Sequence, residues 1–380
     1  MEKNKTVLIV AGEASGDQHA AGLVREIKCR KSSITFWGLG GARLKNEGVD
    51  VRADLVSLAV IGFSEVLKHL KMIRAVYKQL LCDIDRERPD LAILVDYPGF
   101  NLHLAKDLKK RGIPVIYYIS PQIWAWGKGR IKTIKETVSR MIVLFPFEET
   151  LYRQYGIPVS FVGHPSLDHV KPEKKESEFR TLYSLDPSKR TIGLLPGSRQ
   201  KEVKTLLPIM LDTAGLIKRN SASPVQFIVL AAPTVPSGLI SSIVQQHGVP
   251  VTIVNNMTYE GIAASDFCLV CSGTATLETG IIGTPMIILY KVNFLTWLYM
   301  RLLIRIPYIG LVNVVAGRKI AQEFIQFDAR PDTIASYCKT VLDDQNKLAA
   351  LRKELKDVKQ SLGTTGATGR AAEAVIKHMG

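Results

Sequence analysis

A single aspartate stands directly after an apolar run in the first half of the chain. The run Leu91-Ala-Ile-Leu-Val95 reads as a buried strand, and Asp96-Tyr-Pro-Gly-Phe-Asn101 follows it. A carboxylate at the tip of such a strand can act as a general base or hold a substrate by hydrogen bonds. The alternative is that Asp96 only caps the turn that Tyr97 and Pro98 begin. The position favours a chemical role for Asp96.

The segment after the first apolar run is also unusually polar. Residues 7–11 are apolar, and the sequence that follows brings Glu13, Ser15, Asp17 and His19 onto one short turn. Glycines and a serine that open a helix can present backbone N–H groups to an anion, although the spacing is not the GxGxxG of dinucleotide-binding proteins. Asp17 fits equally the N-cap of the next helix, and His19 fits either a solvated helix position or a site.

Two motifs in the second half of the chain are typical of phosphate binding. Leu195-Pro-Gly-Ser-Arg199 combines backbone donors, Ser198 and a guanidinium, which together make an anion-binding corner unless Arg199 is simply a surface residue. Ser272-Gly-Thr-Ala-Thr-Leu-Glu278 opens a helix whose N-terminus can hold a phosphate. Glu278 lies four residues after Thr274, on the same helical face, where it can accept hydrogen bonds from a ribose. The alternative is a capped core helix with a solvated glutamate.

Three further stretches combine aromatic, aliphatic and basic residues. Ser120-Pro-Gln-Ile-Trp-Ala-Trp126 places Trp124 in a loop, either as part of the core or as a platform in a site. Residues 279–322 contain no Asp or Glu but include Trp297 and several Lys and Arg, which suits anionic lipid better than nucleic acid. The helical pattern of residues 66–84, which begins with Val66, Leu67, Leu70 and Ile73, reads either as a core helix or as a lipid-facing lip.

These motifs follow short apolar runs, and the runs define the elements that must position them. In the first half the predicted strands are residues 7–11, 91–95, 115–119, 141–145 and 160–162. In the second half they are residues 191–195, 226–230, 251–254, 267–271 and 286–290. Helical patterns lie between the runs, which indicates two parallel sheets covered by helices on both faces. We therefore expect two doubly wound α/β halves with a cleft between them, joined near the charged residues 171–178, with ligands at the carboxyl ends of the strands.

Composition limits the partners. The chain has 380 residues, of which 46% are hydrophobic and 22% charged, and a net charge of +15. These values exclude disordered and fibrous classes. The positive charge favours nucleotide phosphates, nucleic acid or an acidic membrane surface as partners and does not choose among them.

Cysteines and apolar stretches bear on the compartment. Cys268 and Cys271 form a CxxC inside an apparent buried strand, with no further ligand pair for zinc, so we expect no metal site there. The odd count of five cysteines favours a reducing compartment. The N-terminal apolar run is too short for a secretory signal, and Lys291, Arg301 and Arg305 interrupt the longest uncharged stretches. We therefore expect a cytosolic protein that touches a membrane at most peripherally.

As a set, in order and at similar spacing, the motifs resemble those of the lipid-A-disaccharide synthase family. The resemblance runs from about residue 6 to residue 330 and is specific only as a set. The motifs that carry it are Ala11-Gly-Glu-Ala-Ser-Gly-Asp17, Asp96-x-Pro-x-Phe-Asn101, Ser120-Pro-Gln-Ile-Trp-Ala-Trp126, Phe145-Pro-Phe-Glu148, Val162-Gly-His-Pro165, Leu195-Pro-Gly-Ser-Arg199, Ser272-Gly-Thr-Ala-Thr-Leu-Glu278 and Asn313-Val-Val-Ala-Gly-Arg-Lys-Ile-Ala-Gln-Glu323.

The resemblance implies an inverting glycosyltransferase of the GT-B type that requires no metal or other cofactor. Its implied reaction moves 2,3-diacylglucosamine from UDP to the 6-hydroxyl of 2,3-diacylglucosamine 1-phosphate (lipid X), in lipid A biosynthesis. The implied partners are these two substrates and the anionic inner membrane of a Gram-negative cell, on its cytoplasmic side. No nucleic acid is expected, and a homodimer is compatible with the resemblance.

The resemblance also assigns roles, which are expectations here. Asp96 would be the base or an essential carboxylate, with Glu13 and Arg199 also counted as catalytic. The UDP and donor residues would be Ser198, Arg199, Ser272, Gly273, Thr274, Glu278, Asn313, Arg318, Gln322 and Glu323. The acceptor side would hold Ser15, Asp17, His19 and Trp124. The membrane contact would comprise Val66, Leu67, Leu70, Ile73 and Trp297. The N-terminal, acceptor domain would span residues 1–170 and the donor domain residues 171–380, with a last helix that returns to the first domain or crosses to a partner.

The chain departs from the family pattern at three places. Gly99 stands where many members carry a second Asp, Val312 stands where Pro is common, and residues 171–188 are only loosely similar. Two other readings are open. One is another UDP-sugar GT-B enzyme, such as a peptidoglycan lipid II transferase or a UDP-sugar epimerase. The other is a non-enzymatic protein that binds anionic lipid.

Overall fold

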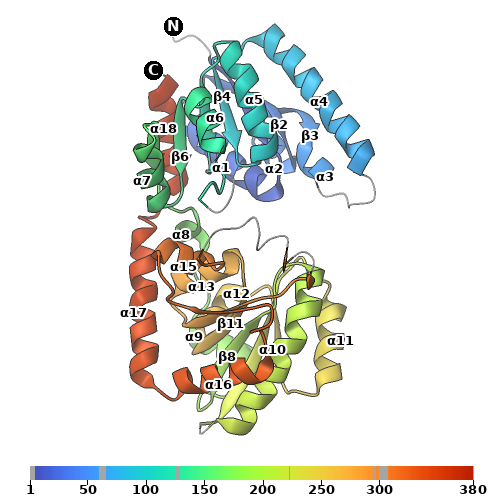
Figure 1. Ribbon diagram of the computed structural model, residues 1–380, viewed down its shortest axis with the longest axis vertical. Helices are drawn as coiled ribbons and strands as arrows, with labels where there is room; N and C mark the ends of the chain where they lie inside the picture. The colour runs from blue at the N-terminus through green and yellow to red at the C-terminus, as the bar shows by residue number, and fades with distance from the viewer. Residues whose placement is uncertain are drawn as a thin grey trace. The chain divides into compact units, whose positions relative to one another are not determined.

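The computed structural model describes residues 5–59, 66–124, 129–221, 223–294, 297–298 and 307–379, without the side chains of residues 58–59 and 66–70. The chain divides into two compact units. The first comprises Met1–Pro165 together with Gly363–Gly380, and the second comprises Ser166–Leu362. Each unit is a parallel sheet with helices on both faces (Figure 1), which confirms the doubly wound α/β prediction.

The first unit is built on a seven-stranded parallel sheet in the order β3-β2-β1-β4-β5-β6-β7. Its strands are β1 (Lys5–Ala11), β2 (Ile34–Gly40), β3 (Asp50–Asp54), β4 (Leu91–Val95), β5 (Val115–Tyr118), β6 (Arg140–Val143) and β7 (Val159–Phe161). Its helices are α1 (Ala14–Arg30), α2 (Ala42–Asn46), α3 (Leu55–Ala59), α4 (Val66–Glu87), α5 (Pro98–Lys110), α6 (Arg130–Thr137), α7 (Pro146–Gln154) and α18 (Ala367–Met379).

The side-chain alternation of β1 builds the two cores of this unit. Leu8 and Val10 belong to a cluster on one face of the sheet, and Val7 and Ile9 belong to a cluster on the other. Successive side chains of a strand point to opposite faces, so a strand with apolar residues at every position is buried on both sides. The continuous apolar run of β1 therefore requires helices above and below it.

The last helix of the chain packs on the first unit. Helix α18 contacts α1, and its Ala371, Ala372 and Val375 are fully buried in the same cluster as residues of β1. The Nε atom of Arg370 also donates to the carbonyl of Val162 at 2.8 Å. Of the two arrangements compatible with the sequence, the structure has the helix return to its own first unit.

The second unit has a six-stranded parallel sheet in the order β10-β9-β8-β11-β12-β13. Its strands are β8 (Arg190–Leu195), β9 (Val225–Ala231), β10 (Thr252–Asn255), β11 (Phe267–Cys271), β12 (Met286–Tyr290) and β13 (Gln322–Ile325). Its helices are α8 (Ser166–His169), α9 (Glu176–Leu182), α10 (Gln200–Asn220), α11 (Ser237–His247), α12 (Thr258–Ala263), α13 (Thr274–Ile282), α15 (Leu311–Ala316), α16 (Pro331–Leu342) and α17 (Gln345–Ser361).

Strand order reverses once in each sheet. The reversal lies between β1 and β4 in the first unit and between β8 and β11 in the second. Loops that leave neighbouring strands at such a point diverge to opposite faces of the sheet and open a crevice at the carboxyl ends, which is where ligands bind in this architecture. Four of the motifs singled out in the sequence follow these four strands, and the motif that begins at Ser120 follows β5.

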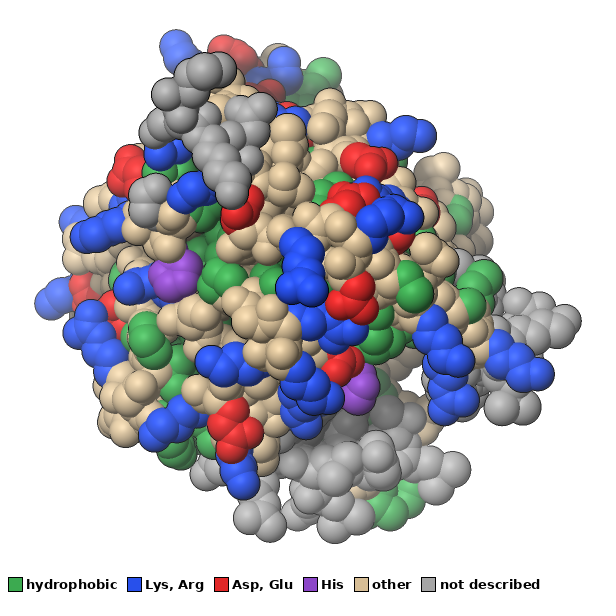
Figure 2. Space-filling model, turned by 90° about the horizontal axis from the view of Figure 1, so that it is seen from above, with side chains coloured by type: hydrophobic (Ala, Val, Ile, Leu, Met, Phe, Trp, Pro, Cys, Tyr) green, Lys and Arg blue, Asp and Glu red, His purple; other side chains and the backbone are tan. Residues whose placement is uncertain are grey.

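Basic side chains are spread over the surface. On the face shown in Figure 2, Lys and Arg are distributed widely, with acidic side chains among them, so no single stripe of positive charge tracks across it. Both cysteines of the CxxC are buried free thiols on β11. Among the described residues, no cluster of His, Cys, Asp and Glu could hold a metal ion, and no helix is both long and apolar enough to cross a membrane.

Candidate active site

Asp96 lies at the switch point of the first sheet. It follows β4, and Glu13 follows β1, whose last residue Ala11 pairs with Val95 in the parallel register. Burial raises the pKa of the Asp96 carboxyl to about 6, and the charge of Glu13 adds to the shift. The structure thus brings together two carboxylates, those of Glu13 and Asp96, that are 83 positions apart in the chain. Asp96 is poised to exchange a proton near neutral pH.

The turn that presents Asp96 is strained. Asp96 and Tyr97 have φ values of 48° and 45°, in the left-handed region that non-glycine residues avoid, at a cost of about 1–3 kcal/mol each. The carbonyl oxygen of Asp96 accepts hydrogen bonds from Tyr117 Oη at 2.5 Å and from Asn101 Nδ2 at 2.8 Å. These bonds hold the turn through the backbone of Asp96, and the backbone N–H of Tyr97 also acts on its carboxylate, where it lowers the pKa against the larger effect of burial.

Gly12 allows the loops after β1 and β4 to pack closely. A Cβ on Gly12 would lie 2.2 Å from Cδ1 of Tyr97, which is far inside van der Waals contact. The ring of Tyr97 therefore covers Gly12 directly. Glu13 and Ser15 beside it are exposed, as expected for residues that meet a ligand.

Asp17 has a different position from the one expected of an acceptor-side residue. Its side chain is 3% exposed, and its carboxylate accepts from the backbone N–H groups of Gly41 at 2.8 Å, Arg43 at 3.0 Å and Leu44 at 3.4 Å. It does not cap its own helix either, because α1 begins at Ala14 with Glu13 as its N-cap. Asp17 instead caps the start of α2, so any effect on a ligand passes through that loop. His19, on α1, is half-buried.

Trp124 belongs to a buried polar cluster that the sequence did not reveal. Its Nε1 donates to Glu148 Oε1 at 3.4 Å, and the hydroxyls of Ser120 and Tyr152 lie 2.8 Å apart. Glu148 is 3% exposed, and burial raises its pKa to about 8. In the sequence, Glu148 stands out only as the last residue of the Phe145-Pro-Phe-Glu148 motif, which carries no assigned role. Trp126 lies outside the described residues.

In the second unit, the corner after β8 is closed by a glutamate. Glu202 Oε2 accepts from the backbone N–H groups of Ser198 at 3.1 Å and Arg199 at 3.2 Å, so the donors expected to be free are occupied. Arg199 Nη1 lies 3.2 Å from Glu202 Oε1, and its side chain is 83% exposed. Gly197 has φ +114°, and a Cβ there would lie 2.5 Å from Glu202 Oε2. The corner therefore offers an anion the exposed guanidinium of Arg199 once it leaves Glu202.

The loop after β11 exposes a helix N-terminus. Gly273 and Thr274 are exposed at the start of α13, whose first N–H groups have no intrahelical acceptor. Gly273 has φ +150°, with nothing within 4 Å of a Cβ built there, and Ser272 Oγ donates to the carbonyl of Ile309 at 3.0 Å. This end of α13 has the shape and the dipole of an anion site.

Glu278 is set back from that N-terminus. It is half-buried on α13, and burial raises its pKa. The pKa of Tyr259 on α12 is raised to about 12 by burial and by the charge of Glu278, which places the two side chains near one another. A half-buried carboxylate of this kind is a suitable acceptor for sugar hydroxyls.

Asn313 and Glu323 fasten the neighbouring loop. Asn313 has no exposed surface. Its Nδ2 donates to the carbonyl of Ala321 at 2.8 Å and to Glu323 Oε1 at 2.9 Å, while its Oδ1 accepts from the N–H groups of Ile320 and Ala321. Glu323 also accepts from the N–H of Ile309 at 3.1 Å. Direct contact of Asn313 with a donor was expected, but its amide is fully engaged with Ile320, Ala321 and Glu323, and Glu323 in turn holds the Ile309 backbone.

The two other residues of that stretch make local contacts. Arg318 is exposed and pairs with Glu354 at 2.9 Å. Gln322 is half-buried, and its Nε2 donates to the carbonyl of Glu323 at 3.1 Å. Arg318 is thus available to a ligand only if it leaves Glu354.

The residues expected at a membrane are only partly described. Val66, Leu67 and Leu70 belong to α4, but their side chains lie outside the described part of the chain. Ile73 is half-buried and lines a pocket between α4 and α5. Trp297 packs edge-on against Phe327 with ring centroids 5.3 Å apart, beside an exposed Phe294.

Known proteins match the chain over almost its whole length. The family model described as lipid-A-disaccharide synthetase matches residues 7–376. The lipid-A-disaccharide synthase of Syntrophus aciditrophicus is 47% identical over 370 residues, covering 97% of this chain and 96% of that protein. The Geobacter sulfurreducens protein of the same name is 42% identical over 374 residues, covering 98% and 97%.

Solved structures support the fold. A UDP-N-acetylglucosamine 2-epimerase from Neisseria meningitidis, bound to UDP-GlcNAc, has a TM-score of 0.61 at 13% identity and covers 98% of this chain and 100% of that one. A putative enzyme of the same kind from Listeria monocytogenes has a TM-score of 0.63 at 11% identity, covering 99% and 96%. With the two Rossmann-like sheets and the length and identity of the sequence matches, the chain belongs to the lipid-A-disaccharide synthase family, glycosyltransferases of lipid A biosynthesis.

Proposed function

We propose that this protein transfers 2,3-diacylglucosamine from UDP to the 6-hydroxyl of 2,3-diacylglucosamine 1-phosphate with inversion at the anomeric carbon. The acceptor oxygen forms a bond to that carbon while the bond to the diphosphate breaks, and the electron pair leaves with UDP. The proton of the acceptor hydroxyl passes to a base. The observation that carries the proposal is the carboxylate of Asp96 at the switch point of the first sheet.

Asp96 meets the requirements for that base. An inverting displacement needs one group to take the proton, and a base works best when its pKa is close to the working pH. The pKa of about 6 leaves Asp96 ionised at neutral pH while making it a stronger base than an exposed aspartate. Glu13 lies near enough to raise the pKa of Asp96, and we assign it the role of orienting the acceptor.

The second unit suits the leaving nucleotide. Diphosphate charge develops as the bond breaks, and an arginine and a helix N-terminus are efficient stabilisers of such charge. Arg199 and the start of α13 supply these two groups, and Glu278 is an acceptor for the ribose hydroxyls. Structural relatives solved with UDP-GlcNAc or UDP support a nucleotide sugar as the ligand class. With these groups in place we propose that no metal is required.

The acylated substrates and the charge point to a location. Both proposed substrates are anionic lipids, and the net charge of +15 favours an anionic surface. We therefore place the protein on the cytoplasmic side of the inner membrane as a peripheral protein. Nucleic acid is not a proposed partner.

The test is turnover by purified protein with UDP-diacylglucosamine and lipid X. Wild-type protein should form UDP and disaccharide phosphate, with activity retained in chelator. Asp96→Asn should lower kcat by about 10²–10⁴-fold while UDP affinity survives, because the UDP-binding residues belong to the second unit. The matched control is Asp85→Asn, an exposed aspartate that pairs with Arg111, which should keep full activity.

Three outcomes would contradict the proposal. Full turnover by Asp96→Asn would exclude Asp96 as the base. Epimerisation of the UDP-sugar without an acceptor would favour an epimerase. Lipid binding with no turnover by wild-type protein would favour a non-enzymatic function.

A further inference from the structure

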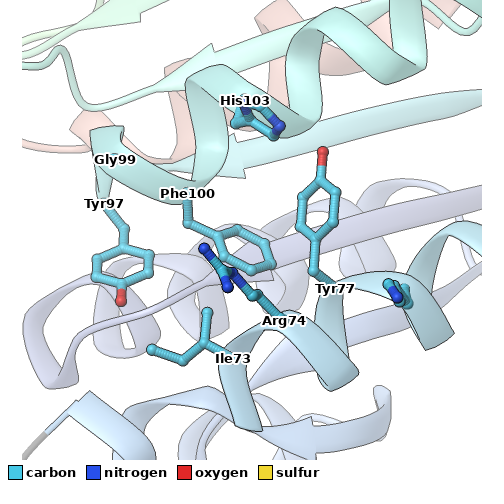
Figure 3. Close-up of a pocket in the computed structure, with 8 residues that line it drawn as sticks. Ile73, Arg74, Tyr77, Tyr97, Gly99, Phe100 and His103 are labelled. Carbon is cyan, nitrogen blue, oxygen red and sulfur yellow. The ribbon is translucent and has the colours of Figure 1, made fainter. Parts of the chain in front are cut away.

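The first unit contains a pocket of about 420 Å³ between α4 and the start of α5. Ile73 and Tyr77 line it from α4, and Tyr97 and Phe100 line it from the turn and first residues of α5 (Figure 3). This volume falls in the range of about 300–1,000 Å³ that is common for small-ligand sites. None of these four residues belongs to the catalytic groups described above.

The wall of the pocket is aromatic and fixed. The rings of Tyr77 and Phe100 meet edge to face with centroids 5.3 Å apart, and those of Tyr97 and Phe100 stack at 6.0 Å. Tyr77 Oη donates to Asp107 at 2.7 Å, so its polar end is satisfied and its ring is free to meet hydrocarbon. Such a wall favours an aliphatic chain over a polar ligand.

The rim of the pocket is cationic. Arg74 and Lys78 line it from α4 one helical turn apart, and both are exposed. His103 lines it from α5, 5.5 Å from the ring of Tyr77. Asp107 is close enough for His103 to lower its pKa, and it is held by Tyr77 and Lys110. Among the described residues Arg74 and Lys78 form no ion pair, so an anionic head group would complement them.

The pocket adjoins the proposed base. Tyr97 is both a lining residue and the neighbour of Asp96 in the strained turn. An amphiphile with its chain on the aromatic wall would therefore hold its polar part next to the Asp96 turn. We propose that this pocket binds one acyl chain of the acceptor, with the anionic group of the acceptor at Arg74 and Lys78. This inference rests on the proposed function, since it names the acceptor's subsite.

Gly99 offers a way to fill the pocket without disturbing the fold. It lines the pocket and is exposed, and a Cβ built on it meets nothing within 4 Å. It is the second residue of α5. Gly238 is the second residue of α11 in the other unit and is likewise exposed, with nothing within 4 Å. Gly99→Leu and Gly238→Leu are therefore a matched pair of which only the first fills the pocket.

The first experiment measures binding of alkyl phosphates by calorimetry, with octyl, decyl and dodecyl phosphate as probes. In wild-type protein affinity should rise about fourfold per added methylene until the chain fills the pocket. Gly99→Leu should bind dodecyl phosphate at least tenfold more weakly and lose the dependence on chain length, while Gly238→Leu should match wild type. Equal binding by all three proteins would overturn the inference.

The second experiment tests the rim. The double variant Arg74→Gln/Lys78→Gln should bind dodecyl phosphate at least tenfold more weakly than wild type does. Its affinity for the neutral dodecyl maltoside should stay within twofold of wild type. Lys109→Gln, an exposed lysine on α5 that does not line the pocket, is the control. An equal loss for both probes would contradict a site for the anionic group.

Turnover and vesicle binding separate this inference from the proposed function and from membrane docking. With active wild-type protein, Gly99→Leu should raise KM for lipid X at least tenfold and leave KM for the UDP-sugar unchanged. An unchanged KM for lipid X would overturn the pocket and leave the transferase intact. A further outcome is that wild-type protein binds alkyl phosphate, loses that binding in Gly99→Leu, and yet shows no turnover. That result would overturn the transferase proposal and leave the chain-binding pocket standing. Gly99→Leu should sediment with phosphatidylglycerol vesicles as wild type does; a loss would assign the pocket to membrane lipid instead.

Discussion

At the scale of single residues, burial sets the pKa of two carboxyl groups. Asp96 and Glu148 both have a raised pKa, to about 6 and about 8, and burial is the largest cause in each. Their surroundings differ. Asp96 has a second carboxylate, Glu13, near it, whereas Glu148 is enclosed by the hydrogen-bond donors of Trp124 and of the Phe145 backbone. The charge of Glu13 adds to the raised pKa of Asp96, which suits proton transfer, whereas the donors around Glu148 lower its pKa and burial outweighs them, which leaves a buried structural acid.

The raised pKa of Asp96 predicts opposite effects on activity and stability. Below pH 6 the base is protonated, so kcat/KM should fall about tenfold per pH unit. Glu13→Gln removes a charge that raises the pKa of Asp96, so it should move this fall in kcat/KM to lower pH. Between pH 3.8 and 6 the folded state binds more protons than the unfolded state, so the contribution of Asp96 to stability falls as pH rises. Asp96→Asn should thus stabilise the protein by about 1–3 kcal/mol at pH 7. Urea unfolding at pH 4 and pH 7 measures this; equal stabilities would contradict it.

Glu148 should be protonated at neutral pH. Its pKa of about 8 predicts that its contribution to stability declines from pH 4.5 to pH 8 and is level above, because only the folded state retains the proton in that window. Glu148→Gln imitates the protonated form and should remove this decline. The expected result in thermal melts is that the variant gains on wild type as pH rises from 5 to 8. Asp85→Asn, which changes an exposed acid, should show no such gain.

At the scale of elements, the loops that leave the strands at the two switch points depend on glycine for close packing. Gly12 lies under the ring of Tyr97, and Gly197 lies against Glu202. In both places a side chain would push away a neighbour that holds a site residue. A substitution in the loop that carries a site residue is therefore expected to disturb the site, just as a substitution of the site residue does.

Gly12→Ala should show this sensitivity. The added Cβ would overlap the Tyr97 ring, so the Asp96 turn must shift, and we expect a loss of about 1–3 kcal/mol in the free energy of unfolding with at least tenfold lower turnover. Gly99→Ala, in the same loop region but with open space around its Cβ, should be as stable as wild type or slightly more. Chemical denaturation of both variants checks the contrast. A stable, fully active Gly12→Ala would refute the close packing.

At the scale of the whole molecule, the chain closes on its own first unit. Helix α18 supplies Ala371, Ala372 and Val375 to the core that α1 and β1 build, although about 200 residues of the second unit come between. A face of a sheet that loses its covering helix exposes an apolar patch, which favours association.

Removal of residues 364–380 should therefore destabilise the first unit. We expect the first unit of the truncated chain to unfold in a separate step, with a midpoint about 5 °C or more below that of the full chain, since each kcal/mol of lost stability lowers Tm by about 2–8 °C. Aggregation should follow this step. Differential scanning calorimetry of the truncated and full chains measures it. Val375→Ala, which leaves the helix in place, should give a smaller shift in the same direction.

Some of this architecture is written in local sequence. Continuous apolar runs such as Leu91–Val95 and Phe267–Cys271 are strands because such runs are buried on both faces, and both are confirmed. Strands β2, β3 and β13 were missed. Ile34–Gly40 holds two glycines and Asp50–Asp54 is mostly polar, so neither resembles a core strand, and Gln322–Ile325 follows the long stretch without acids. Pairing with a neighbour makes them strands, and pairing is not a local property.

The sequence by itself determined that there are two doubly wound halves and which loops carry chemistry, because apolar periodicity and the residues that follow each strand are local signals. Only the tertiary structure decided what those residues meet. In the folded chain, Asp17 accepts hydrogen bonds from the start of α2, and the amide of Asn313 is enclosed by hydrogen bonds. Glu148 is buried, and Glu13 lies near Asp96. Burial and hydrogen-bond partners come from segments distant in the chain, and they decide whether a polar residue serves the fold or a ligand.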